Sequence, residues 1–127
     1  MDKKAPTVEQ YLSTLASPYK ELIERLRTII LRHFPTIKET VMHEGLWFES
    51  RFYLAKIGDH VNLGVNIKGL SKEEVSLFLG TGKSMRHLKF FPDQEIDGPK
   101  LLEKLQIVYR KADAGEQITW HLDKKKK

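Results

Sequence analysis

The stretch that decides the fold is RFYLAKIGDHVNLGVNI, residues 51–67. It contains two strand-like runs separated by Gly58-Asp59, a pair that favours a tight β-hairpin turn. After the turn, apolar residues occupy every second position: Val61, Leu63, Val65 and Ile67. A period of two is typical of a strand with one buried and one polar face, so the stretch predicts the central hairpin of an antiparallel sheet.

Helical patterns flank this hairpin on both sides. Near the N-terminus, Thr7 and Gln10 have the spacing of a capping box. Ser17 is expected to cap a second helix, with Pro18 at its first position, and Pro99 is expected to open the last one. Helices before and after an antiparallel sheet predict a two-layer α+β fold, in which the N- and C-terminal helices cover one face of the sheet.

Shorter elements are expected between these segments. We predict a strand at 38–43, an aromatic connector or short strand at 46–48, a helix at 72–79 and a strand at 85–91. Gly45 is expected to supply the bend between the first two, and Ser71 with Glu74 has capping-box spacing before the helix. Residues 117–122 predict a small terminal strand or an ordered coil.

Length and composition narrow the class of protein. The 127 residues predict a single domain over residues 1–123, followed by a basic tail at 124–127 that we expect to be disordered. The tail holds four of the five net positive charges, so a nucleic-acid partner is not expected for the body of the chain. There is no cysteine, no apolar run long enough to cross a membrane and no apolar leader, so we expect a cytoplasmic protein without a membrane partner. No feature of the sequence fixes an oligomeric state.

The polar side of the hairpin is the first candidate for a binding site. If helices cover its apolar side, the other side stays open. The candidate ligand-binding residues there are Trp47, Tyr53, His60, Asn62 and Asn66. Polar groups beside aromatic rings are typical of small-molecule sites, although the same pattern also fits an ordinary solvated sheet face.

A glycine turn at 80–82 begins the second candidate segment, which contributes Lys83, Ser84, Arg86 and His87. Gly82-Lys83-Ser84 resembles the end of a phosphate-binding loop, but Leu77 stands where that loop needs its first glycine. The helix also precedes the strand, so nucleotide hydrolysis is not expected. The turn could offer backbone N–H groups and nearby cations to an anion. It equally fits a helix-ending turn before a charged edge strand.

Metal binding and catalysis have no positive signal in the sequence. The five histidines show no metal-ligand spacing, so no metal site or cofactor is predicted. His33 is expected near the buried side of its helix. Ser84 and His87 are three positions apart on a strand and therefore face opposite sides, which does not suit a nucleophile and its base. We expect a non-catalytic binding or accessory protein, not an enzyme.

GDHVNLGV at 58–65, GTGKSMRHLKF at 80–90 and an amphipathic helix beginning near Asp97 resemble the YdhG-like family of small bacterial domains of unknown function. The resemblance spans roughly residues 7–112 and implies a compact α+β fold similar to frataxin. One branch of the family has been described as a frataxin-like iron chaperone. Members often carry a Trp-Gly-x-Pro-like segment before the hairpin, where this chain has HEGLW at 43–47 without the proline. The function we expect is binding of a small polar or anionic ligand or a protein partner, and the resemblance adds intracellular iron delivery as the alternative.

Overall fold

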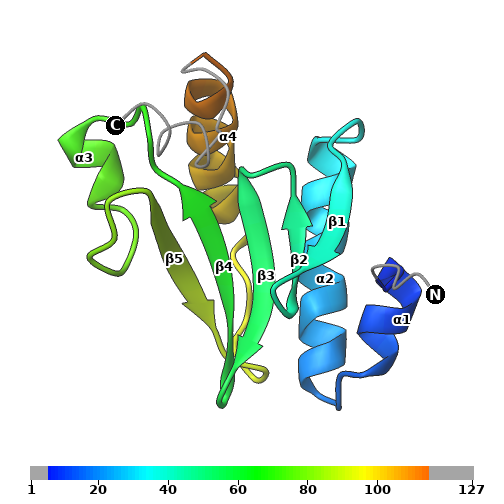
Figure 1. Ribbon diagram of the computed structural model, residues 1–127. Helices are drawn as coiled ribbons and strands as arrows, with labels where there is room; N and C mark the ends of the chain where they lie inside the picture. Colours follow the sequence, from blue (N-terminus) through cyan, green and yellow to red (C-terminus); the bar gives the residue numbers. More distant parts are fainter. Residues whose placement is uncertain (1–5, 115–127) are drawn as a thin grey trace.

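The structure is a computed structural model and describes residues 6–114 (Figure 1). Its elements, in chain order, are α1 (Val8–Ser13), α2 (Tyr19–His33), β1 (Glu39–Met42), β2 (Gly45–Phe48), β3 (Phe52–Ile57), β4 (His60–Asn66), α3 (Lys72–Val75), β5 (Met85–Phe90) and α4 (Gly98–Ala114).

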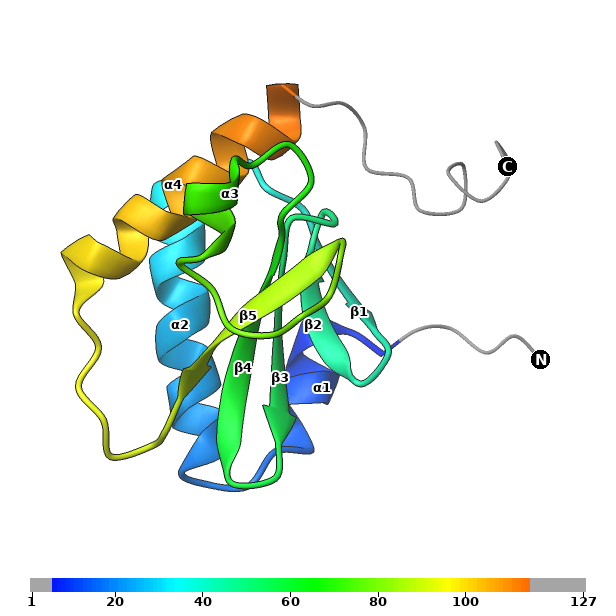
Figure 2. The same cartoon turned by 90° about the vertical axis from the view of Figure 1, so that its left-hand side faces the viewer.

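The five strands form one antiparallel sheet in the order β1-β2-β3-β4-β5, so each strand pairs with its neighbours along the chain. Helices α2 and α4 lie together on one face of this sheet (Figures 1 and 2). The predicted two-layer α+β fold is therefore confirmed. The Gly58-Asp59 turn also forms as predicted: Ile57 pairs with His60, and Gly58 has a φ of 60°.

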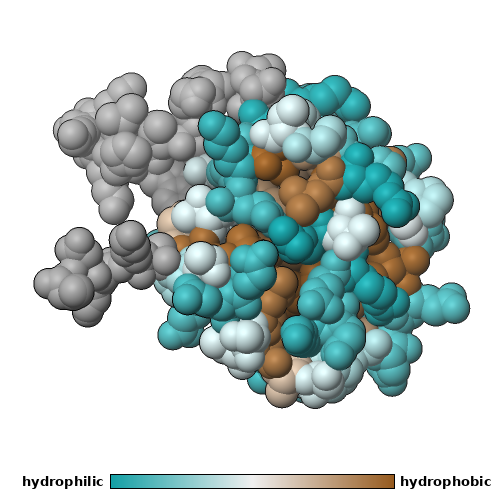
Figure 3. Space-filling view, turned by 90° about the vertical axis from the view of Figure 1, so that its right-hand side faces the viewer, coloured by the Kyte–Doolittle hydropathy of each residue, from teal (hydrophilic) through white to brown (hydrophobic). Residues whose placement is uncertain are grey.

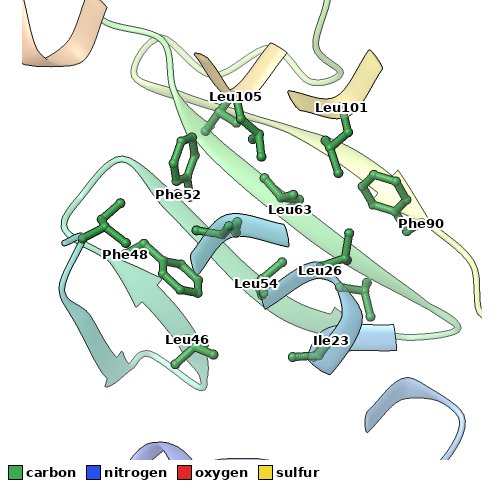
Figure 4. Packing of buried hydrophobic residues seen from close by; sticks show 14 of the residues in the cluster. Ile23, Leu26, Leu46, Phe48, Phe52, Leu54, Leu63, Phe90, Leu101 and Leu105 are labelled. Atoms are coloured by element: carbon green, nitrogen blue, oxygen red, sulfur yellow. The ribbon is translucent and has the colours of Figure 1, made fainter. Parts of the chain in front are cut away.

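The core lies between the sheet and these two helices. The alternating residues Val61, Leu63 and Val65 are completely buried. In Figure 4, Ile23 and Leu26 of α2 and Leu101 and Leu105 of α4 point towards the strands. Leu46, Phe48, Phe52, Leu54, Leu63 and Phe90 meet them from the sheet. The apolar side of the hairpin is thus covered by helices, as its period predicts.

Both predicted capping boxes are present. The Gln10 backbone N–H donates to Thr7 Oγ1 at 3.1 Å, and the Thr7 N–H donates to Gln10 Oε1 at 2.8 Å. Ser71 and Glu74 exchange the same two hydrogen bonds at the start of α3. Each pair satisfies backbone donors that a helix N-terminus leaves without partners.

Helix α2 differs from its prediction at both ends. It begins at Tyr19, one residue after Pro18, and the Ser17–Pro18 peptide is cis. Ser17 does not cap the helix, because its hydroxyl donates to the Glu21 carboxylate at 2.8 Å. His33 is exposed and not buried, since the last helical turn has rotated it away from the sheet.

The bend between β1 and β2 lies at His43-Glu44, one step before the predicted Gly45. Met42 pairs with Gly45, and the two residues between them have φ values of 51° and 57°. Positive φ at both central residues defines the turn type that follows the twist of a hairpin. Gly45 stays extended in β2, so the predicted connector at 46–48 is part of a strand.

Helix α3 is shorter than predicted and ends at Val75. Leu79 leaves the helical pattern because its backbone exchanges two hydrogen bonds with His87 of β5, at 2.8 and 3.0 Å. The terminal segment at 117–122 and the basic tail at 124–127 lie outside the described residues. No helix in residues 6–114 is long and apolar enough to cross a membrane.

Candidate ligand-binding face

The sheet face that α2 and α4 leave uncovered is here called the open face. Strand register assigns to it these positions: Thr40, Met42, Gly45, Trp47, Tyr53, Ala55, Ile57, His60, Asn62, Gly64, Asn66, Met85, His87 and Lys89. None of these strand positions carries a carboxylate. Three of them carry basic side chains, so the strands give the open face a positive bias.

An aromatic pair covers the middle of the open face. The rings of Trp47 and Tyr53 are 4.9 Å apart, and the two residues are direct partners across β2 and β3. Tyr53 is also the partner of Gly64 on the other side. A β-carbon at position 64 would lie 1.9 Å from Tyr53 Cε2, so the ring lies against the glycine backbone. The two rings are inclined by 36°, and Trp47 is buried whereas Tyr53 is partly exposed, so Tyr53 is the ring that the sheet presents beside β4.

Asn62 places a polar group next to this aromatic surface. Burial raises the pKa of Tyr53, and the side-chain hydrogen bond with Asn62 opposes that shift. Asn62 therefore lies close enough to the Tyr53 hydroxyl to affect its ionisation. Asn62 Oδ1 is buried and has no hydrogen-bond partner among the described residues. Turning the amide over would exchange the two atoms and still leave one of them unpaired.

The basic residues of the open face lie on β4 and β5. Lys89 pairs with Asn62, and His87 pairs with Gly64. His60 stands at the start of β4, with Nδ1 3.2 Å from Asp59 Oδ1 and its ring 5.6 Å from that of Phe91. The pKa of His87 is lowered, first by burial and then by the positive charges of Lys89 and His60. These three side chains form what we call the basic cluster.

Asn66 does not belong to the open site, and its prediction as a ligand contact is wrong. Its side chain is completely buried. Nδ2 donates to the Ser50 carbonyl at 3.3 Å, and Oδ1 accepts from the Lys68 N–H at 2.9 Å. Asn66 therefore fixes the end of β4 against two loops and has no accessible polar atom for a ligand.

The glycine-turn candidates diverge in the structure. Arg86 pairs with Val65 and so points to the helix side, where its Nε donates to the Gly82 carbonyl at 3.0 Å. The Ser84 carbonyl accepts the Ile67 N–H, and the Lys83 side chain is exposed in the turn. Only His87 of this segment joins the open face.

The predicted residues that do come together are Trp47, Tyr53, His60, Asn62 and His87. Lys89 joins them, since the alternation of β5 predicts that it shares a face with His87, and the register places both there. The placement of Lys89 beside His87 can therefore be predicted from the sequence. Phe91 could not be placed beside His60 from the sequence, because it lies just after the end of β5.

Within residues 6–114, no three or more histidine, aspartate or glutamate side chains are close enough to share a metal ion. Iron delivery remains a prediction from resemblance. Titration of ferrous and ferric iron into the metal-free full-length chain tests it, with saturable binding as the supporting result.

The fold and this site define a class of small α+β domain, in which one sheet face is buried by helices and the other presents aromatic and basic side chains. No family model and no curated protein matches the sequence. Among solved structures, YdhG of Bacillus subtilis, a protein of the DUF1801 family, is similar with a TM-score of 0.60 and 18% identity. The match covers 87% of this chain and 93% of YdhG. At that identity the likeness shows the fold, and it confirms the YdhG-like fold that the sequence motifs predict.

Proposed function

We propose that this chain is a non-catalytic binding protein whose open face holds a small anionic ligand with a flat apolar part. The observation that supports this most is the register of the sheet, which aligns the basic cluster beside the Trp47–Tyr53 pair. No strand position of the open face carries a carboxylate, and Asp59 in the turn before β4, 3.2 Å from His60 Nδ1, is a carboxylate with which an anion would compete. A flat apolar group would lie against the partly exposed Tyr53 ring, behind which Trp47 is buried, while the anion meets the basic cluster.

Two members of the basic cluster and the neighbouring Asn62 would contribute different kinds of contact. Lys89 is exposed and brings a full positive charge. His87 can donate one ring N–H while neutral, and a bound anion would oppose the repulsion from Lys89 and His60 that lowers its pKa. Asn62 offers an amide that has an unpaired polar atom. These groups bind and orient a ligand without forming a covalent bond to it.

Calorimetric titration with phenyl phosphate tests the proposal, because this probe has both a flat ring and a dianion. Lys89→Gln and His87→Gln should each weaken binding by about tenfold, the size of one charge-assisted hydrogen bond. Lys72→Gln is the matched control, because this substitution removes the same charge at an exposed position of α3. Inorganic phosphate should bind more weakly than phenyl phosphate. Equal losses in all three variants would mean that only net charge matters and would reject the site.

A further inference from the structure

A cavity lies between α1 and the turn that joins β1 to β2, at the edge of the sheet. Its volume is about 820 Å³. It is lined by Pro6, Gln10, Tyr11, Ser13, Thr14, Leu15, Val41, Met42, His43, Glu44 and Lys56. Figure 3 views the side of the molecule that α1 and β1 form, and hydrophobic surface shows there in strips between polar side chains. Cavities of this size are typical of small-molecule sites.

Two of the polar side chains in the lining are already used inside α1. The Ser13 hydroxyl donates to the Gln10 carbonyl at 2.8 Å, and the Thr14 hydroxyl donates to the Tyr11 carbonyl at 2.7 Å. Hydroxyls bonded in this way turn their apolar side outwards. With Leu15, they make the helix side of the cavity largely apolar.

The charged groups of the lining have opposite signs: Glu44 lies in the turn between β1 and β2, and Lys56 lies on β3. An added β-carbon at Gly45 would lie 3.4 Å from the Cβ of Ala55, so these two residues are neighbours across β2 and β3. Glu44 precedes Gly45 and Lys56 follows Ala55, so they are the next two residues that face each other. Glu44 lies near Tyr11, because its charge adds to burial in raising the pKa of that phenol. Lys56 lines the cavity, and its Nζ lies 4.8 Å from the centre of the Tyr19 ring, which is outside the lining. An anion and a cation thus border one apolar space.

The backbone that presents Glu44 is unusual. His43 and Glu44 both have positive φ, a conformation that asparagine and glycine adopt far more readily. Non-glycine residues in this conformation cost free energy and are frequent at functional sites. The next turn also has positive φ at two residues, Glu49 and Ser50, and at His43-Glu44 this conformation places two exposed titratable residues in the cavity lining.

We propose that this cavity binds a small zwitterion with an apolar side chain, of the class of a free apolar amino acid. Glu44 would pair with the ammonium group and Lys56 with the carboxylate, while Leu15, Val41 and Met42 contact the side chain. Glu44 and Lys56 are both exposed, so a ligand with only one of the two charges would form one ion pair fewer than a zwitterion. This site is independent of the open face, and either proposal can fail without the other.

The experiment compares three ligands that share one skeleton: L-phenylalanine, phenethylamine and 3-phenylpropionate. Each is titrated into the full-length, ¹⁵N-labelled protein and followed by amide chemical shifts. L-Phenylalanine should bind at least about tenfold more tightly than either singly charged compound, since one ion pair of this kind is worth about that factor. The shifts should centre on α1 and the β1–β2 turn.

Two variants assign the charges. Glu44→Gln should remove the advantage of L-phenylalanine over 3-phenylpropionate, and Lys56→Gln should remove its advantage over phenethylamine. Glu103→Gln and Lys72→Gln are the controls, because both residues are exposed on helices away from the cavity. Amide spectra of the free variants verify that they remain folded. Equal affinity for the three compounds, no saturable binding, or shifts elsewhere in the molecule would overturn the proposal.

Discussion

Gly64 shapes the open face by having no side chain. The Tyr53 ring occupies the space where a β-carbon would stand, 1.9 Å from Cε2. The ring is consequently held between Trp47 and the β4 backbone, and its position depends on one residue of the neighbouring strand. The position of the Tyr53 ring is therefore a property of position 64 as much as of the aromatic residues.

Gly64→Ala should destabilise the fold by about 1–3 kcal/mol, because the added methyl group displaces a packed ring. Urea unfolding measures the change. Gly98→Ala is the matched control, since nothing lies within 4 Å of its added β-carbon. That variant should be neutral or slightly stabilising, as Ala restricts the unfolded chain more than Gly does. If both variants lose the same stability, the contact between Gly64 and Tyr53 is not the cause.

Asn66 and Asn62 lie on the same strand face but should respond differently to truncation. Asn66→Ala leaves the Lys68 N–H and the Ser50 carbonyl without their partner and should cost about 1–3 kcal/mol. Asn62→Ala should cost less than about 1 kcal/mol, because Asn62 Oδ1 has no hydrogen-bond partner among the described residues that the substitution could remove. Thermal or urea unfolding of the two variants gives the comparison. A larger loss for Asn62 would contradict the assignment of Asn66 as the structural residue.

At the scale of elements, the short-range patterns of the sequence were sufficient where local chemistry decides the structure. The capping boxes at Thr7 and Ser71 and the Gly58-Asp59 turn depend on residues three positions apart or fewer, and all three form as predicted. The alternation of β4 also assigned the buried side of the sheet correctly.

The errors come from interactions between segments that are distant in the sequence. The end of α3 is set by the pairing of Leu79 with His87, which no local pattern encodes. Asn66 is buried because the loop at Ser50 covers the end of β4. The alternation of residues predicts which face of the strand a side chain lies on, but not whether a loop covers it. The turn at His43 has no glycine or asparagine, so the sequence favoured the nearby Gly45.

An ion pair attaches α2 to the edge of the sheet. Arg27 donates from Nε and Nη2 to the two carboxylate oxygens of Glu39, at 2.5 and 3.0 Å. Both side chains are partly buried. A double-mutant cycle with Arg27→Met and Glu39→Gln should give a coupling of about 1 kcal/mol, and high salt should reduce it. Arg27→Lys should recover little of it, because an ammonium group cannot make both bonds in the same geometry. Full recovery by lysine would contradict a bidentate contact.

Over the whole molecule, stability should depend on pH, because burial and then the positive charges of Lys89 and His60 lower the pKa of His87. The folded state lowers the pKa of His87 below its usual 6.5, so the unfolded chain takes up this proton first as the pH falls. Stability therefore rises with pH in this window and is lost as the pH drops below 6.5. Glu21, Asp59 and Glu74 have lowered pKa values and act only at more acidic pH, below about 4 to 4.5.

His87→Gln should remove part of this dependence. Urea titration gives the free energy of unfolding of the natural chain and of the variant at each pH. Between pH 7.5 and pH 5.5, the natural chain should lose more stability than the variant. A saturating anion on the open face should reduce that loss, because it stabilises the protonated imidazole. A difference that does not change with pH would show that His87 is not held in a repulsive environment.

The central claim is that the uncovered face of the sheet binds an anion through β4 and β5. The most direct measurement is the map of amide and indole chemical-shift changes when phenyl phosphate is added to the ¹⁵N-labelled, full-length protein. We predict saturable changes centred on residues 60–64 and 87–91, with residues of α2 unaffected. Changes confined to α2 and α4, or a uniform drift without saturation, would contradict the claim.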